Sequence, residues 1–278
     1  MKEKLNELQL MMLDMIKWFH SFCNKYDIRY YVVGGTMLGA VRHHGFIPWD
    51  DDIDVGIPRK DYERLLANKN IWLADESRYY LESYKDGYKD FEYSYAKIYD
   101  THTTLAENCR CHTKRGIFID VFPIDGIGNS HEDALLNYAP IEKYVNFLMT
   151  RTCELRKNRK AYKNIAILVS RLVPSFLLNN NSLITRINKL CAERDFDTSV
   201  FVGNLLGNWG KKEIMPREYF GTPTLYQFED TEVFGPEKYD AYLTNVYKNW
   251  RQLPPPEKQK SEHDFLYLNL HKSYLDKN

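Results

Sequence analysis

The chain has 278 residues, with 38 Lys and Arg against 38 Asp and Glu, and 44% of its residues are hydrophobic. A chain of this kind can bury a core, which excludes an intrinsically disordered protein. The balanced charge argues against a protein that binds nucleic acid through a basic face. No run of about 18 uncharged apolar residues occurs, so no membrane-spanning helix is predicted.

Hydrophobic periodicity predicts alternating helices and strands in the first half of the chain. Apolar residues spaced by three and four indicate a helix over residues 5–23. The β-rich run 30–33 predicts a strand that ends in a tight turn at Gly34 and Gly35. The remaining elements are a short helix at 36–42, a strand at 53–57, a helix around 60–67, and strands at 93–99 and 116–122, the last closed by Pro123.

The character of the sequence changes from about residue 131. Residues 132–195 contain few glycines and predict several helices, and the part from 209 onward is mixed. We therefore divide the chain into a core (1–130), a helical insertion (131–208) and a C-terminal part that completes the core domain (209–278). The N-terminal residues are charged throughout, unlike a signal peptide, and the five cysteines form no paired C-x-x-C clusters. We expect a cytoplasmic protein with reduced thiols.

Four acidic residues occupy five positions after a glycine-rich segment: Asp50, Asp51, Asp52 and Asp54. Like charges at this density are costly unless a cation neutralises them, and hard oxygen ligands suit Mg²⁺ or Mn²⁺. On the predicted strand, Asp52 and Asp54 are two residues apart, which places both carboxylates on one face. The pattern predicts that they share a metal ion.

A third carboxylate is expected from a neighbouring strand. Asp120 is the natural candidate, because an acid inside an apolar strand must be paired or bound to a metal. Asp125 is the rival, but it follows Pro123 and fits a loop or cap better. Gly34, Gly35 and Thr36 lie between a strand and a helix, where backbone N–H groups can meet a phosphate.

These residues fall within three long motifs that resemble the LicD family. The motifs are Gly-Gly-x-x-Leu-Gly-x-x-Arg at 34–42, Gly-Phe-Ile-Pro-Trp-Asp-Asp-Asp-Ile-Asp-Val at 45–55 and Ile-Asp-Val-Phe-Pro-Ile-Asp at 119–125. The family includes bacterial phosphocholine transferases, and its eukaryotic relatives resemble fukutin-related ribitol-phosphate transferases. The resemblance implies an α+β fold with a DNA-polymerase-β-like nucleotidyltransferase core, a mixed sheet flanked by helices.

Carried onto this chain, the resemblance implies that Gly34, Gly35 and Thr36 hold donor phosphates. It also implies that Asp52, Asp54 and Asp120 form a catalytic, metal-binding triad. The expected reaction moves phosphocholine from CDP-choline to a sugar hydroxyl of a cell-surface glycan precursor, of the teichoic acid or lipopolysaccharide type, and releases CMP. Mg²⁺ is the expected cofactor, with Mn²⁺ as the alternative.

Other residues are weaker candidates. Arg42 is a candidate phosphate ligand, with a salt bridge to the nearby acids as the alternative, and Lys97 is a second, with an exposed lysine as the alternative. Trp49 is expected to wall the site, with stacking on a base as the alternative. Further candidates for ligand contact are Asp51, Glu229 and His263. Choline, a quaternary ammonium, would be held by aromatic faces, but the sequence does not single out which.

Three other functions remain open on the sequence alone: transfer of ribitol or glycerol phosphate from another CDP-linked donor, nucleotidyl transfer from an NTP, and a glycan- or metal-binding protein without catalysis. If the glycan acceptor is lipid-linked, the protein would work at the inner face of the membrane. The basic run 151–163 and the apolar run 165–178 could then lie on an anionic membrane surface. The alternative is a buried helix with a solvated basic face.

Overall fold

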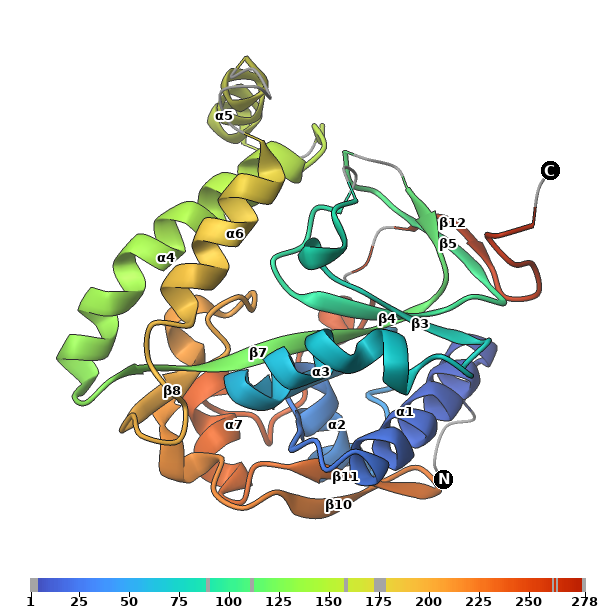
Figure 1. The fold of residues 1–278 in the computed structure, drawn as a ribbon, viewed down its shortest axis with the longest axis horizontal. Coiled ribbons are helices and arrows are strands. Elements are labelled where there is room, and N and C mark those ends of the chain that lie inside the picture. Colours follow the sequence, from blue (N-terminus) through green and yellow to red (C-terminus); the bar gives the residue numbers. More distant parts are fainter. Residues whose placement is uncertain are drawn as a thin grey trace.

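The computed structural model describes residues 5–88, 91–110, 113–157, 160–172, 179–261, 263 and 265–276. Its centre is a seven-stranded sheet in the order β1-β2-β7-β4-β3, to which β8 and β9 are added beside β7. Figure 1 shows the long strand β7 running through the middle of the molecule. The pair β2–β7 is parallel, whereas the other pairs are antiparallel. The strands are β1 (Tyr31–Val32), β2 (Asp54–Pro58), β3 (Tyr79–Glu82), β4 (Ala96–Asp100), β7 (Phe118–Gly128), β8 (Phe201–Gly203) and β9 (Ile214–Pro216).

Helices surround this sheet, so the predicted α+β class with a mixed sheet is confirmed. The helix expected at 5–23 is α1, whose N-terminus is fixed by a reciprocal capping box between Asn6 and Gln9. The specific DNA-polymerase-β-like core stays a prediction. The helices are α1 (Glu7–Lys25), α2 (Gly34–His43), α3 (Arg59–Trp72), α4 (His131–Thr152), α5 (Ala161–Arg171), α6 (Asn180–Cys191) and α7 (Tyr239–Tyr247).

Two smaller sheets complete the fold. One is the hairpin of β10 (Thr224–Phe228) and β11 (Thr231–Gly235), and the other has the order β12-β5-β6, formed by Phe265–Asn269, Thr104–Glu107 and Lys114–Arg115. Short 3₁₀ helices are η1 (Tyr84–Asp86), η2 (Gly210–Glu213), η3 (Arg217–Tyr219) and η4 (Pro256–Lys258). Segments far apart in the sequence are thus neighbours: β11 packs on β1, α7 on α2, and β12 pairs with β5.

The helical region 131–208 is built around α4 and α6, which lie side by side in Figure 1 and pack against each other and β7. The three-part division at residues 130 and 208 stays a prediction. Within the described ranges, no helix is both long and apolar enough to cross a membrane. The described cysteines are free thiols, while Cys111 lies outside the described residues.

The strand expected to close at Pro123 is longer than predicted, since β7 continues to Gly128. Pro123 lacks an N–H donor. It lies between the part of β7 that pairs with β4 and the part that pairs with β8, so no hydrogen bond to either strand is required of it there. The last residue of β7 that pairs with β4 is Val121, and pairing with β8 begins at Asp125. Asp125 was expected in a loop or cap, but it is a fully buried strand residue. Its carboxylate accepts two 2.7 Å hydrogen bonds from Arg59.

Candidate active site

The centre of the site is a pair of carboxylates on adjacent strands. Asp54 on β2 lies directly opposite Asp120 on β7, as expected for a third acid on a neighbouring strand. Asp120 in turn lies opposite Lys97 on β4, and Lys97 lies opposite Glu82 on β3. Side chains of directly paired residues share a face of the sheet. A row of charged side chains therefore crosses four strands on one face.

Asp120 is held by two partners from β4 and the segment before it. Its Oδ1 lies 3.1 Å from Lys97 Nζ, and its Oδ2 accepts a 3.3 Å hydrogen bond from the Tyr95 hydroxyl. Burial raises the pKa of Asp120 to about 6, although the Lys97 ammonium acts in the opposite direction. Tyr95 was not singled out in the sequence, where it is one of 21 tyrosines.

Lys97 is not the exposed lysine that was the alternative to a phosphate ligand, because its side chain is only 1% exposed. Its ammonium lies 3.2 Å from Glu107 Oε2 and faces the rings of Phe118 and Tyr93 at 3.4 and 4.1 Å. A buried cation of this kind must be paired, and Lys97 has two carboxylates. The geometry shows Lys97 positioning Asp120; contact with a phosphate stays a prediction.

The acidic segment that precedes β2 contributes more than the sequence indicated. The sequence predicted Asp52 and Asp54 on one strand, but β2 begins at Asp54, so Asp52 precedes the strand. Asp50, which was not proposed as a site residue, contacts Asp52, and burial followed by repulsion from Asp52 raises the pKa of Asp50 to about 8. Gln9 Nε2 donates to the Asp50 carbonyl at 3.0 Å and fixes this segment against α1.

Two of the weaker candidates meet at the same segment. His263 Nδ1 lies 2.7 Å from Asp51 Oδ1, and His263 Nε2 lies 3.5 Å from Asp52 Oδ2. Burial opposes a charge on this imidazole, but the hydrogen bond with Asp51 and the charge of Asp52 raise the pKa of His263 to about 9. The C-terminal part of the chain thus supplies a cation to the acidic segment.

The glycine-rich segment forms the N-terminus of α2 rather than a separate turn, since the helix begins at Gly34. The Gly34 N–H donates to the Tyr242 hydroxyl at 3.0 Å, and the Thr36 hydroxyl accepts from the Asp54 N–H at 2.9 Å. A Cβ built on Gly34 would lie 3.0 Å from Asp54 Oδ2, and one on Gly35 would lie 2.8 Å from an Asp50 oxygen. Both glycines therefore permit carboxylates to approach the positive end of the helix.

Two other candidates, Arg42 and Glu229, are not brought to the acids. Arg42 lies near the opposite end of α2, about 12 Å along the axis from Gly34. It forms no salt bridge with the acidic segment but donates to the Trp250 carbonyl at 2.9 Å. Glu229 accepts from the Phe46 N–H at 3.0 Å. Together with Trp49, Arg42 and Glu229 line a separate cavity of about 1080 Å³.

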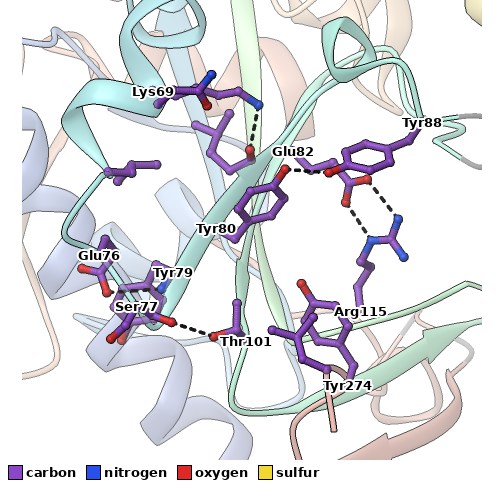
Figure 2. A pocket seen from close by; sticks show the side chains of 14 residues that line it. Lys69, Glu76, Ser77, Tyr79, Tyr80, Glu82, Tyr88, Thr101, Arg115 and Tyr274 are labelled. Carbon is purple, nitrogen blue, oxygen red and sulfur yellow. Dashed lines mark hydrogen bonds and ion pairs between the residues drawn. The ribbon is translucent and has the colours of Figure 1, made fainter. Parts of the chain in front are cut away.

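A cavity of about 180 Å³ lies between the strand region and the end of α4. Tyr95, whose hydroxyl reaches Asp120, lines it together with Met149 and Thr152 of α4. A larger cavity of about 600 Å³ lies at the β3 edge of the sheet, and Figure 2 shows the paired side chains of Glu82 and Arg115 on its wall. The aspartates of the acidic segment and of β7 do not line that larger cavity, so it is separate from the acids.

The carboxylates of Asp52, Asp54 and Asp120 are candidate ligands for a divalent cation. In the part of the chain that the structure describes, no three His, Cys, Asp or Glu side chains converge as a complete metal site. Mg²⁺, however, is commonly held by one or two carboxylates, with substrate phosphates and water as its other ligands. Burial, followed by repulsion from Asp52 and Asp120, raises the pKa of Asp54 well above its usual value. A cation would relieve that repulsion, so the donor set fits Mg²⁺.

The chain is similar to known proteins, to one of them over nearly its whole length. Residues 27–147 match the model of the LicD/FKTN/FKRP family, nucleotidyltransferase domain. The chain is 30% identical over 270 residues to the lipopolysaccharide cholinephosphotransferase LicD of Haemophilus influenzae, covering 94% of this chain and 97% of that protein. Over 81 residues it is 35% identical to the human ribitol 5-phosphate transferase FKRP, covering 28% of this chain and 16% of FKRP.

The fold and site define a mixed α+β protein whose clustered carboxylates suit the chemistry of phosphate groups, and both of these relatives are transferases. The chain belongs to the LicD family.

Proposed function

We propose that this protein transfers phosphocholine from CDP-choline to a sugar hydroxyl of a cell-surface glycan precursor and releases CMP. The observation that carries the proposal is the facing pair of Asp54 and Asp120, beside Asp52, in a chain similar over nearly its whole length to a lipopolysaccharide cholinephosphotransferase. A DNA-polymerase-β-like core for this domain belongs to the same proposal.

Asp54, with Asp52 or Asp120 as a second carboxylate, would hold Mg²⁺ together with oxygens of the donor pyrophosphate, because two protein carboxylates suffice for this ion. When bound, the cation would neutralise the charge of the donor phosphates and of the departing CMP. The N–H groups of Gly35 and Thr36 lie at the positive end of α2, beside the carboxylates of Asp54 and Asp50. We assign these two residues to the donor phosphates, whereas the Gly34 N–H is already bonded to Tyr242.

Transfer requires the acceptor hydroxyl oxygen to attack the distal phosphorus in line with the bridging oxygen, whose bond to that phosphorus breaks as CMP leaves. The proton of the hydroxyl must pass to a base. Asp120 is our candidate, because Lys97 and Tyr95 fix the orientation of its carboxylate from the β4 side. His263 would orient Asp51 and Asp52 in the same way on the other side of the site.

Ribitol phosphate transfer is the second candidate, because the match to FKRP covers 81 residues at 35% identity. It would retain the acids and the leaving CMP and change only the group that moves. Nucleotidyl transfer from an NTP would instead release pyrophosphate.

A donor panel separates these reactions. The purified protein is incubated with Mg²⁺ and, separately, CDP-choline, CDP-ribitol, CDP-glycerol, CTP or ATP, each with and without a glycan acceptor. CMP and pyrophosphate are quantified by chromatography. The proposal predicts CMP from CDP-choline and acceptor-dependent appearance of phosphocholine on the glycan. CMP only from CDP-ribitol would favour the second candidate, and pyrophosphate from an NTP without CMP would overturn both.

A further inference from the structure

Helix α5 (Ala161–Arg171) contacts the rest of the protein through a narrow strip. Ile167 and Ser170 are 2% and 4% exposed, and the Ser170 carbonyl accepts a 3.0 Å hydrogen bond from Arg151 of α4. Figure 1 shows α5 beyond the end of α4 and α6, at the periphery of the molecule. The helix is therefore attached along one side only.

The opposite side of α5 is apolar and exposed, so the alternative of a buried helix is wrong for the described residues 161–172. Residues 173–178 of the apolar run lie outside the described residues. The exposed side chains recur at steps of three and four, which places them on one face of the helix. They are Tyr162, Ile165, Leu168, Val169 and Leu172, with exposed fractions of 62, 58, 49, 57 and 78%.

The surroundings of this face are strongly basic. Residues 151–172 contain seven Lys and Arg and one acidic residue, Glu154, giving a formal excess of six positive charges (seven minus one). Glu154 is paired with Arg171 at 3.1 Å. Lys157, Lys160 and Lys163 are exposed at the beginning of the helix. A helix with an exposed apolar face and exposed lysines at its beginning is typical of helices that lie in the plane of an anionic membrane surface.

We propose that α5 docks this protein on an anionic lipid bilayer. The apolar face would lie at the boundary of headgroups and acyl chains, and the lysines would contact lipid phosphates. A second copy of this chain is a poor occupant, because two such faces would bring two basic segments together. Charge complementarity therefore favours an anionic lipid surface.

Docking through α5 would bring the cavity near Asp120 close to the membrane. The end of α4, from which the chain leads to α5, lines the 180 Å³ cavity through Met149 and Thr152, and Tyr95 in the same cavity reaches Asp120. Docking would place the entrance of this cavity near the bilayer, where a lipid-linked acceptor resides. This use rests on the proposed function, whereas membrane binding itself does not.

Vesicle sedimentation with the full chain tests the docking. Vesicles of phosphatidylcholine alone are compared with vesicles containing phosphatidylglycerol, at low and high salt. We expect binding only to the anionic vesicles, weakened by salt. Ile165→Glu with Leu168→Glu, and separately Lys157→Glu with Lys160→Glu and Lys163→Glu, should each lower the bound fraction at least about tenfold. Ile71→Glu, at a 74% exposed apolar residue on α3, is the matched control and should bind like the wild type.

Three results would overturn the docking proposal: no binding to anionic vesicles at low salt, an equal loss with Ile71→Glu, or a concentration-dependent dimer that the Ile165 and Leu168 changes dissociate. CMP release in solution without vesicles is measured in parallel. Loss of vesicle binding with retained CMP release would show that docking and catalysis are separate, and retained vesicle binding without CMP release would contradict only the proposed function.

Discussion

Asp54 on β2 and Asp120 on β7 lie opposite each other in a parallel strand pair, and among the described residues only Asp120 of the two is paired with a cation, Lys97. Burial and four neighbouring acids, Asp52, Asp120, Asp50 and Glu213, raise the pKa of Asp54 well above its usual value. The ionised Asp54 carboxylate therefore lowers the free energy of unfolding of the protein when no cation is bound.

Asp54→Asn should make the protein more stable in the presence of EDTA. A folded-state pKa above the usual value means that the ionised side chain opposes folding at neutral pH, and asparagine removes that charge at nearly constant shape. We expect a gain on the order of 1 kcal/mol in the free energy of unfolding, measured by urea titration. A loss of stability would show that the carboxylate is instead compensated in the folded state.

Mg²⁺ should stabilise the wild type, because a ligand that binds only the folded state raises its stability, by about 2.7 kcal/mol at one hundred times the dissociation constant. Asp54→Asn and Asp120→Asn should remove this increase in melting temperature. Asp75→Asn, at an exposed loop position, is the control and should retain it. An equal increase in all four proteins would place the cation elsewhere.

Lys97→Met should be strongly destabilising. The substitution preserves most of the side-chain volume but leaves the Asp120 and Glu107 carboxylates without their shared cation. Breaking a buried ion pair from one side costs about 3–5 kcal/mol, which guanidinium titration would measure. Adding Asp120→Asn to Lys97→Met should restore part of that loss. Wild-type stability in Lys97→Met would mean that the ammonium is dispensable for folding.

The sequence predicted the strand pair of Asp54 and Asp120 because both acids occur in short β-rich runs, one of them among apolar residues. It could not predict that β7 continues through Pro123. The proline is tolerated because it lies between the residues that pair with β4 and those that pair with β8, and these pairings exist only in the assembled sheet. For the same reason Asp125 was mistaken for a loop residue, although Arg59 pairs with it in the core.

Long-range partners were the least predictable part of the site. Asp50 was visible in the acidic run, but its burial against Gly35 depends on how α2 packs. Tyr95 and Tyr242 carry no local signal, because their roles come from single hydrogen bonds to residues far along the chain. His263 shows the opposite case: a weak candidate that the fold brings to Asp51 across more than two hundred residues.

Protonation of the buried Glu213 side chain should make the stability of the protein depend on pH. Burial raises the pKa of this 4% exposed side chain from 4.5 to about 8. Between those values the folded protein keeps a proton that the unfolded chain has lost, so wild-type stability should fall as pH rises, by at most about 1.4 kcal/mol per pH unit from this group. The shift in melting temperature between about pH 5 and about pH 8 should shrink in Glu213→Gln. An unchanged shift would contradict a protonated Glu213.

The most direct test of the proposed chemistry is CMP release from CDP-choline, in the presence of Mg²⁺ and a glycan acceptor, by the wild type, Asp54→Asn and Asp75→Asn. Circular dichroism confirms that each variant is folded. We expect Asp54→Asn to lose at least about a hundredfold in rate while remaining at least as stable as the wild type, and Asp75→Asn to retain full activity. Full activity in folded Asp54→Asn would contradict a catalytic role for the facing carboxylates.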